Sequence, residues 1–530
     1  MRALSRPVPI ALFCTACLLV ILAGVWGPSA AAAELRVSDG TVVVEDSTAF
    51  VEFDVSWRLS WRNETNWDAA WLTVKAPIGR GGIPLKLAPQ GHRMVDTRTP
   101  EQPGAAFRVS PDSLGTFVYR ETPTEGRGTN DWTLRLQLVL PSRVQPSDLP
   151  TSLLVHGVEM VYVPEGPFAV GDPQRPKEAP VNAFFQQTVD PTEAPPYRIT
   201  SSEAIPVCDG PGSLCYPRLD NPYDSLRVGD FQGPVPASYP KGYDAFYLMK
   251  YKVTQGQYAE FLSSLSGNQE AERAIMGAAK YRYNRGAIQA VSDRYVAGRP
   301  DRACNYLSWA DAAAYADWAA LRPMTELEYE KAARGPTAPV AGEFAWGSTR
   351  IAHGDTLFAA DSTIAQTENG TEFVRGNAHY TPAGVKWEGG YNRTFTGGDE
   401  GRGPLRVDIF ETHAYRTDGA NLPGGSLREA GGAGYYGALG LSGGPFDRVV
   451  TVGDTTGRAF RGTHGDGRLN YPASASNGDW PSMNGDGLGL RGGTSTDGPN
   501  EIHTAVRNWG DYNAHYRSPG MSFRAARTAP

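Results

Sequence analysis

Cysteine is scarce in this chain, with five residues in 530. Cys14 and Cys17 lie in an N-terminal segment that we expect to be removed, which leaves Cys208, Cys215 and Cys304. No CxxC pair or regular histidine spacing accompanies them, so the pattern does not indicate a structural zinc site. Cys208 and Cys215 enclose a short loop that contains Pro and Gly. In an oxidising compartment we expect these two to form a disulfide and Cys304 to be left unpaired.

Long apolar runs are also missing. The mostly apolar stretch at residues 11–25 is shorter than the roughly 20 residues that a membrane-spanning helix needs. Arg2 and Arg6 precede this stretch and small residues follow it at 31–33, as in a secretory signal peptide. An uncleaved anchor is the alternative. We expect residues 1–33 to be cleaved and the protein to be exported to the periplasm, the cell surface or the exterior, with no later membrane span. No cysteine follows the apolar core to carry a lipid anchor.

Positive charge is not in excess, because 50 Lys and Arg stand against 57 Asp and Glu, for a net charge of −7. This balance does not favour the phosphate backbone, so nucleic acid is not an expected partner. The 61 Gly and 41 Pro are typical of loops and short strands and argue against a helix bundle. A chain of 530 residues is too long for one ordinary core, so two or more domains are expected.

Residues 34–150 have the period-two pattern of strands. Apolar and polar residues alternate at 51–57 and again at 132–138, which predicts half-buried strands and an antiparallel β-sandwich-like domain. Aromatic residues on strands are usually core, so we interpret four tryptophans as core rather than as a sugar-stacking strip: Trp57, Trp61, Trp67 and Trp71. A linker is predicted from three prolines, Pro141, Pro146 and Pro150.

Capping boxes predict three short helices in the following region, residues 155–530. In each box a hydroxyl residue and a Gln, Asp or Glu three positions later bond each other's backbone amides; the pairs are Thr254 with Gln257, Ser308 with Asp311, and Thr325 with Glu328. Gly335 is a plausible C-terminal cap of the third helix. After Trp346 the sequence is rich in Gly, Asn and Asp, which favours brief strands and loops. The many aromatic residues in this part argue against disorder.

Several runs in this region, taken in order, resemble the formylglycine-generating, or sulfatase-modifying factor, family. They are MVYVPEGPFAVGD at 160–172, AFYLMKYKVTQGQYAEFL at 245–262, the strongest match at 305–335, AWG at 345–347, and looser matches at 437–450, 490–493 and 522–524. The resemblance implies a loop-rich C-type-lectin-like domain at 155–530. The expected fold class is therefore α+β, with the β-sandwich-like domain preceding the lectin-like one.

The oxidases of that family bind copper through a cysteine pair near the C-terminus, because soft thiolates select Cu(I). The matching window, residues 491–523, contains no cysteine. Iron-dependent relatives take three histidines from a helical N-terminal domain, whereas this chain has only His92 and His156 in a strand-rich one. We therefore expect neither copper nor a three-histidine iron site.

Calcium is the remaining metal that the resemblance implies. Family members often bind it near the segment that corresponds to residues 443–447, through an asparagine, backbone carbonyls and an acid. Here Gly444 and Asp447 occupy the matching positions, so one side-chain ligand is missing. Asp447 is the candidate metal ligand, and calcium is a possible cofactor.

These observations favour an exported, non-catalytic protein that binds a protein, peptide or glycan. Rigid aromatic residues with polar tips are typical of binding surfaces, and the candidate set is Arg461, His464, Trp480, Trp509, Tyr512, Asn513, His515, Tyr516 and Arg517. That Trp509 and Tyr516 belong to the core is the competing interpretation. The alternative function is a formylglycine-generating-type oxidase or other metal enzyme that uses His503, His515 or nearby carboxylates. A role in envelope assembly is a third hypothesis.

Overall fold

The computed structural model describes residues 35–77, 82–98, 102–174, 182–190, 192–217, 228–265, 267–274, 281, 285–354, 357–358, 373–374, 376–381, 403–419, 422, 425–513 and 515–530. The expected signal peptide, residues 1–33, lies outside these ranges. None of the helices within them is both long and apolar enough to cross a membrane. Strands predominate and the helices are few and short, so the protein is α+β with a majority of strands.

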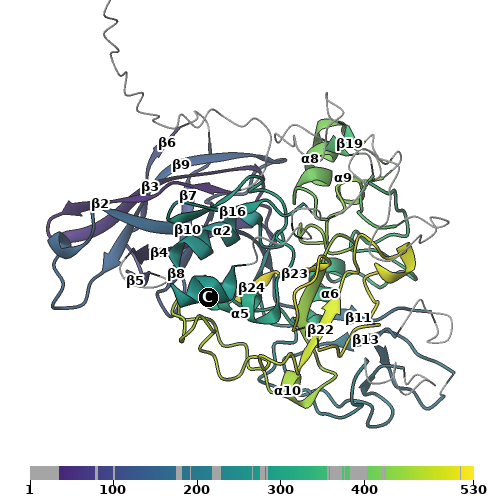
Figure 1. Cartoon of the computed structure of the whole chain (residues 1–530). Coiled ribbons are helices and arrows are strands. Elements are labelled where there is room, and N and C mark those ends of the chain that lie inside the picture. Colours follow the sequence, from purple (N-terminus) through teal and green to yellow (C-terminus); the bar gives the residue numbers. More distant parts are fainter. Residues whose placement is uncertain are drawn as a thin grey trace, which may run out of the picture.

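The N-terminal part is a barrel-like antiparallel sheet, drawn in purple and blue in Figure 1. Six strands pair in a closed ring in the order β10, β2, β3, β9, β5 and β4, and back to β10. Their bounds are Gly40–Glu45 (β2), Thr48–Ser60 (β3), Asp68–Ala76 (β4), Ile83–Leu87 (β5), Gly128–Val139 (β9) and Ser152–Val163 (β10). Further strands flank the ring: Arg36–Val37 (β1), Arg93–Thr97 (β6), Ala105–Val109 (β7) and Gly115–Arg120 (β8). The expected two-layer sandwich is thus replaced by a ring.

The alternation of apolar residues places one face of each strand inside this ring. Val51, Phe53 and Val55 of β3 are buried together with Leu134 and Leu136 of β9, as the period-two pattern predicts. Of the four tryptophans predicted to be core, Trp57, Trp61 and Trp71 are buried. Trp67 is partly buried and packs against the core. The interpretation of these residues as core is confirmed.

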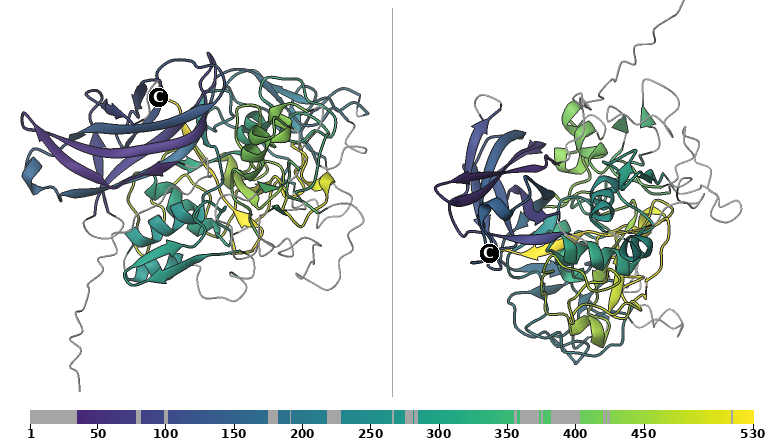
Figure 2. Two further views of the ribbon diagram at one scale, coloured as in Figure 1. Left: turned by 90° about the horizontal axis from the view of Figure 1, so that it is seen from above. Right: turned by 60° about the vertical axis from the view of Figure 1, so that its left-hand side comes forward.

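The same sheet continues into the C-terminal part. Strand β10 also pairs with β15 (Phe246–Met249), which pairs with β24 (Ala525–Thr528), and β24 pairs with β18 (Arg322–Pro323). The predicted linker contains a short 3-10 helix, η1 (Pro146–Asp148), just before β10. Two further views show the C-terminus at the edge of the barrel-like sheet, where Arg108 of β7 donates to the Pro530 carbonyl (Figure 2). The sheet therefore joins the two parts of the chain.

All three predicted capping boxes are present. They begin α2 (Gln255–Ser264), α5 (Trp309–Trp318) and α6 (Glu326–Arg334), and Gly335 ends α6 with a positive φ of 69°. Further helices among the described residues are α3 (Asn268–Arg273), α8 (Ile409–Arg416), α9 (Leu427–Ala430), α10 (Thr455–Arg458) and the 3-10 helix η2 (Pro499–Glu501). The local side-chain bonds of the caps explain why these helix starts were readable from sequence.

Short strands complete the C-terminal part. A three-stranded sheet contains β21 (Phe446–Val450), β22 (Leu488–Arg491) and β23 (Met521–Ser522). Four two-stranded sheets pair β11 (Phe168–Val170) with β13 (Tyr197–Ile199), β12 (Phe185–Gln186) with β14 (Leu214–Cys215), β16 (Ile288–Val291) with β17 (Arg294–Ala297), and β19 (Leu357–Phe358) with β20 (Phe373–Val374). The sheet of β21, β22 and β23 carries the candidate site.

The structure pairs Cys208 with Cys215 and leaves Cys304 as a buried free thiol. We expect replacement of both paired cysteines by serine to lower the free energy of unfolding by about 2 kcal/mol, because the short loop is no longer closed in the unfolded chain. Urea unfolding of the wild type and of the double variant measures this difference. Cys304→Ser serves as the single-thiol comparison. An unchanged unfolding midpoint in the double variant would contradict the expectation.

Candidate functional site

Five of the nine predicted binding residues form one surface cluster, which we call the aromatic ridge: Trp509, Tyr512, Asn513, His515 and Tyr516. The hydroxyl groups of Tyr512 and Tyr516 are 3.2 Å apart, and the ring centroids of Trp509 and Tyr512 are 4.7 Å apart in an edge-to-face arrangement. Asn513 Oδ1 and His515 Nδ1 are 2.6 Å apart. Tyr516 is 41% exposed, which places it on the surface rather than in the core. The ridge therefore presents aromatic rings and polar tips together.

Backbone hydrogen bonds fix the ridge to the scaffold. The Tyr512 amide donates to the Leu488 carbonyl at 2.8 Å, and the Trp509 carbonyl accepts from the Leu490 amide at 2.8 Å. The Trp309 amide, in the first turn of α5, donates to the His515 carbonyl at 3.2 Å. These bonds come from elements far away in the sequence, so the ridge is held in place by the fold and not by its own loop.

Apolar and charged groups also support the ridge from below. Trp509 and Tyr512 are partly buried and pack on Leu490 and Met521. Arg448 of β21 is fully buried and donates from Nη2 to the Tyr516 carbonyl at 2.9 Å, and burial lowers its pKa to about 10. The role of this arginine was not predicted from the sequence, because a charged residue on a strand ordinarily indicates an exposed position.

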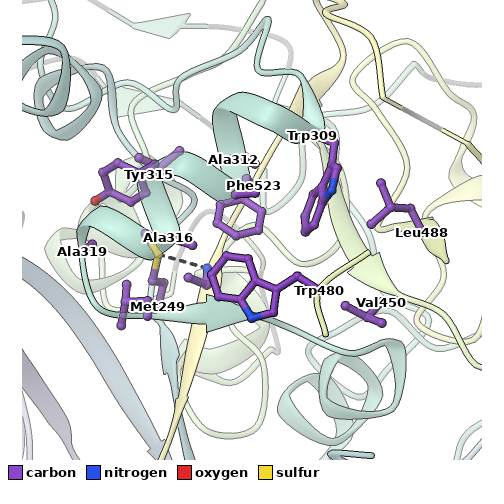
Figure 3. Packing of buried hydrophobic residues seen from close by; sticks show 14 of the residues in the cluster. Met249, Trp309, Ala312, Tyr315, Ala316, Ala319, Val450, Trp480, Leu488 and Phe523 are labelled. Atoms are coloured by element: carbon purple, nitrogen blue, oxygen red, sulfur yellow. Dashed lines mark hydrogen bonds between the residues drawn. The ribbon is translucent and has the colours of Figure 1, made fainter. Parts of the chain in front are cut away.

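Three other predicted residues lie apart from the ridge, namely Trp480, Arg461 and His464. Trp480 is only 7% exposed, donates its Nε1 to the Thr463 carbonyl at 2.9 Å, and belongs to the main core. Figure 3 shows its ring with Phe523 and Trp309 among the buried side chains. The prediction that Trp480 belongs to the ligand surface is wrong for this reason. Arg461 stays exposed, with its amide bonded to Asp479 at 2.9 Å.

His464 has a structural role in the same region. Its Nε2 accepts a hydrogen bond from the Thr528 amide at 3.0 Å, which requires a neutral ring. Burial, followed by the nearby Arg527 and Arg322 cations, lowers the pKa of His464 from 6.5 to about 2. This histidine therefore holds the end of strand β24 in place.

The low pKa of His464 predicts a pH-dependent stability. Because the unfolded chain takes up the proton near pH 6.5 and the folded chain does not, stability present above pH 6.5 is lost as the pH falls towards 2. We expect His464→Gln to reduce this loss between about pH 6.5 and 4, since its Oε1 still accepts a hydrogen bond. Melting temperatures measured across that range test the expectation. His515→Gln, at an exposed position, is the control, and equal acid sensitivity of His464→Gln and wild type would contradict it.

Arg517 is exposed, and its guanidinium group is bonded to an acid. Its Nε and Nη2 donate to the two oxygens of Asp311 at 2.7 and 2.8 Å, and Nη2 also donates to the Glu272 carbonyl. Asp311 is the N3 residue of the capping box that begins α5. Arg517 thus fastens the end of the ridge to that helix.

Asp447, the predicted metal ligand, is buried in β21 between two cations. Lys252 Nζ donates to its Oδ2 at 2.9 Å, and Arg524 Nε lies 3.1 Å from both oxygens. The same two side chains donate to the Gly440 carbonyl. Calcium favours oxygen ligands of this kind, but here side-chain cations already bind them. The residues present therefore do not fit a calcium ion at Asp447.

The window in which the family carries its cysteine pair holds charged side chains instead. Arg491 bonds Glu330 and lies 3.5 Å from Glu326, while Arg507 donates to Glu326 at 2.7 and 3.0 Å. A cavity of about 10 Å³ in this window is barely large enough for one water molecule. With no thiolate among residues 491–523, the donor set does not fit copper.

The histidines of the alternative metal-enzyme hypothesis serve other contacts. His503 packs edge-to-face on Phe344 at 4.7 Å, and burial lowers its pKa. His515 lies in the exposed ridge. Among the residues that the structure describes, no three His, Cys, Asp or Glu side chains are grouped so as to hold a metal ion. The described contacts therefore do not bring together the metal ligands that this hypothesis requires.

Comparison with known proteins supports the family resemblance of the sequence motifs. Residues 225–396 match the family described as a sulfatase-modifying factor enzyme 1-like domain. The chain is similar to the formylglycine-generating enzyme of Bos taurus, with 27% identity over 196 residues, 32% of this chain and 45% of the bovine protein. It is also similar to the formylglycine-generating enzyme of Streptomyces coelicolor, with 48% identity over 52 residues, 10% of this chain and 16% of that protein. The chain thus spans less than half the length of either relative.

Proposed function

Because the chain is a relative of formylglycine-generating enzymes with a sulfatase-modifying factor enzyme 1-like domain at residues 225–396, we propose that it is an exported, non-catalytic binding protein. Its C-terminal part uses a C-type-lectin-like scaffold, and the aromatic ridge contacts a protein, peptide or glycan ligand. The barrel-like sheet positions this scaffold, since β10 belongs to both parts. Calcium is not needed at Asp447, because Lys252 and Arg524 supply the positive charge there.

The observation that carries the proposal is the contrast between two parts of one segment. Residues 491–523 contain no cysteine, so the thiolates that bind copper in the oxidases have no counterpart there. The end of the same segment holds a ridge that backbone bonds fix to β22 and α5. Tyr and Trp contribute large contact areas at low entropic cost, and a fixed ridge loses little further freedom on binding. The segment therefore favours recognition over oxidation.

The test is a glycan and peptide array probed with the purified mature protein and with a Tyr512→Ala/Tyr516→Ala variant. We expect the wild type to bind a defined subset of ligands and the variant to lose about tenfold or more in affinity, as for aromatic residues central to an interface. Tyr471→Ala, the loss of a tyrosine that is 70% exposed and lies outside the ridge, is the matched surface control and is expected to retain binding. Circular dichroism melting confirms that the variants are folded.

The same preparation tests the oxidase alternative. Elemental analysis and incubation with a sulfatase-type cysteine peptide are expected to give no stoichiometric copper or iron and no aldehyde product. Aldehyde formation by the wild type would overturn the non-catalytic proposal. Unchanged array binding by the double tyrosine variant would instead remove the ridge as the binding surface.

A further inference from the structure

A second cavity lies between the barrel-like sheet and the C-terminal part, away from the aromatic ridge. Its walls come from the β3–β4 connection around Trp61 and Arg62, from the β8–β9 loop at Arg127, and from helices α8 and α9. Its volume is about 350 Å³, within the range of about 300–1,000 Å³ that is typical of small-molecule sites, which often lie at domain interfaces.

Positive charge predominates in this cavity. The guanidinium groups of Arg62, Arg127 and Arg428 line it, and Glu411 is the acid among the lining residues. Arg127 bonds Glu411 and lies over the Trp61 ring at 4.2 Å, so that pair is internally neutralised. Arg428 donates to the carbonyl oxygens of Ala333, Ala345 and Ala433, which carry no full charge. Arg428 also lies near the acids Glu343 and Glu429, so Arg62 is the lining cation that pairs with no acid among the described residues.

Arg62 is the group best placed to bind an anion. Its Nη1 donates to the carbonyls of Arg120 and Glu121, and its guanidinium lies 5.5 Å from the Trp67 ring and 5.2 Å from the Tyr119 ring. These contacts hold the group in one orientation. Its Nε is buried and has no hydrogen-bond partner. This donor is closed to solvent, so the group that can face an anion is Nη2, which bonds none of the described residues.

Two glycines form part of the cavity wall. Gly437 has a φ of +89°, and a Cβ at this position would approach the Trp61 ring to 2.5 Å. A Cβ on the neighbouring Gly434 would come within 2.7 Å of the Ala332 carbonyl. Both positions therefore exclude a side chain, which lets the backbone of this wall lie directly against Trp61 and Ala332.

We infer that this cavity binds a small organic anion of about the size of a monosaccharide acid, with its carboxylate or phosphate group on Arg62. Guanidinium groups match such oxyanions in shape and charge. The site is distinct from the aromatic ridge and does not depend on the function proposed for it, since no residue belongs to both. The barrel-like sheet is then part of a binding site and not only a spacer.

Isothermal titration calorimetry with D-glucuronate, D-glucose 6-phosphate and neutral D-glucose tests the inference. We expect at least one anion to bind and glucose not to bind, with affinity that weakens as NaCl rises from about 20 to about 500 mM. Binding by glucuronate rather than by the phosphate would identify a carboxylate as the group on Arg62, and the reverse would identify a phosphate. No heat with either anion, or equal heat with glucose, would overturn the inference.

Variants locate the binding to the cavity. Arg62→Gln is expected to weaken binding by about tenfold or more, as for loss of a charged hydrogen bond. Arg58→Gln removes the same charge from an exposed position on β3 and is expected to leave the affinity unchanged. The Tyr512→Ala/Tyr516→Ala variant is expected to bind the anion like wild type. Equal affinity of Arg62→Gln and wild type would place the anion elsewhere and refute the assignment.

Discussion

Replacement of Asp447 by asparagine is expected to lower the free energy of unfolding by about 3–5 kcal/mol. Asp447 is fully buried and is the acid that both Lys252 and Arg524 contact. Asparagine keeps the shape of the side chain but leaves two buried cations without their counter-charge. Urea denaturation of the purified variant and the wild type, followed by fluorescence, measures the difference in the same buffer.

Two controls separate this ionic role from a metal site. Asp486→Asn, in an exposed loop, is expected to change stability by no more than about 0.5 kcal/mol. Treatment of the wild type with EDTA, followed by excess calcium, is expected to leave its melting temperature unchanged, because Lys252 and Arg524 already bind the oxygens of Asp447. A rise of several degrees with calcium, lost in Asp447→Asn, would show that a calcium ion displaces Lys252.

Glu326→Gln is expected to be similarly damaging, at about 3–5 kcal/mol. The side chain of Glu326 is buried and accepts hydrogen bonds from Arg507, from the Thr451 hydroxyl and from the Val452 amide. Arg491 lies within ion-pair distance of the same carboxylate. Loss of the negative charge leaves the two arginines partly uncompensated in the core. Thermal melting and urea unfolding of the variant measure the effect.

The matched control for Glu326 is Glu64→Gln, an identical change at an exposed position of the β3–β4 connection. It is expected to leave the unfolding midpoint within experimental scatter of the wild type. Array binding by any folded fraction of Glu326→Gln is expected to fall as well, because Arg507, which bonds Glu326, accepts at its carbonyl a hydrogen bond from the amide of Gly510, next to Trp509 of the ridge. A Glu326→Gln protein with wild-type stability would contradict the role given to this ion cluster.

Local patterns predicted the secondary structure well. The capping boxes at Thr254, Ser308 and Thr325 involve hydroxyl and amide groups only three residues apart, so the sequence contains both partners of each bond. The alternation at 51–57 likewise needs only the period of a strand. The expected sandwich differed from the observed ring because closure depends on the pairing of β10 with β4, strands that are far apart in the sequence.

Only part of the candidate site could be predicted from the sequence. The composition of the C-terminal loops pointed to the aromatic ridge, and the structure brings five of its predicted residues together. Burial of Trp480, the bond from Thr528 to His464 and the pairing of Arg517 with Asp311 were not predicted. Each of these depends on a partner that the sequence places far away, and aromatic or charged residues in loops look alike until that partner is known.

Residues close together in the chain are enough to establish the family resemblance, the absence of a cysteine pair at 491–523, the spacing of Cys208 and Cys215, and the helix starts. The surroundings of Asp447 and the lining of the cavity at Arg62 could not be predicted in this way. Lys252 lies 195 positions before Asp447 and Arg524 lies 77 after it, and the cavity joins residue 62 to residue 428. Counter-charges and cavities are formed by such distant contacts, so they exist only once the chain has folded.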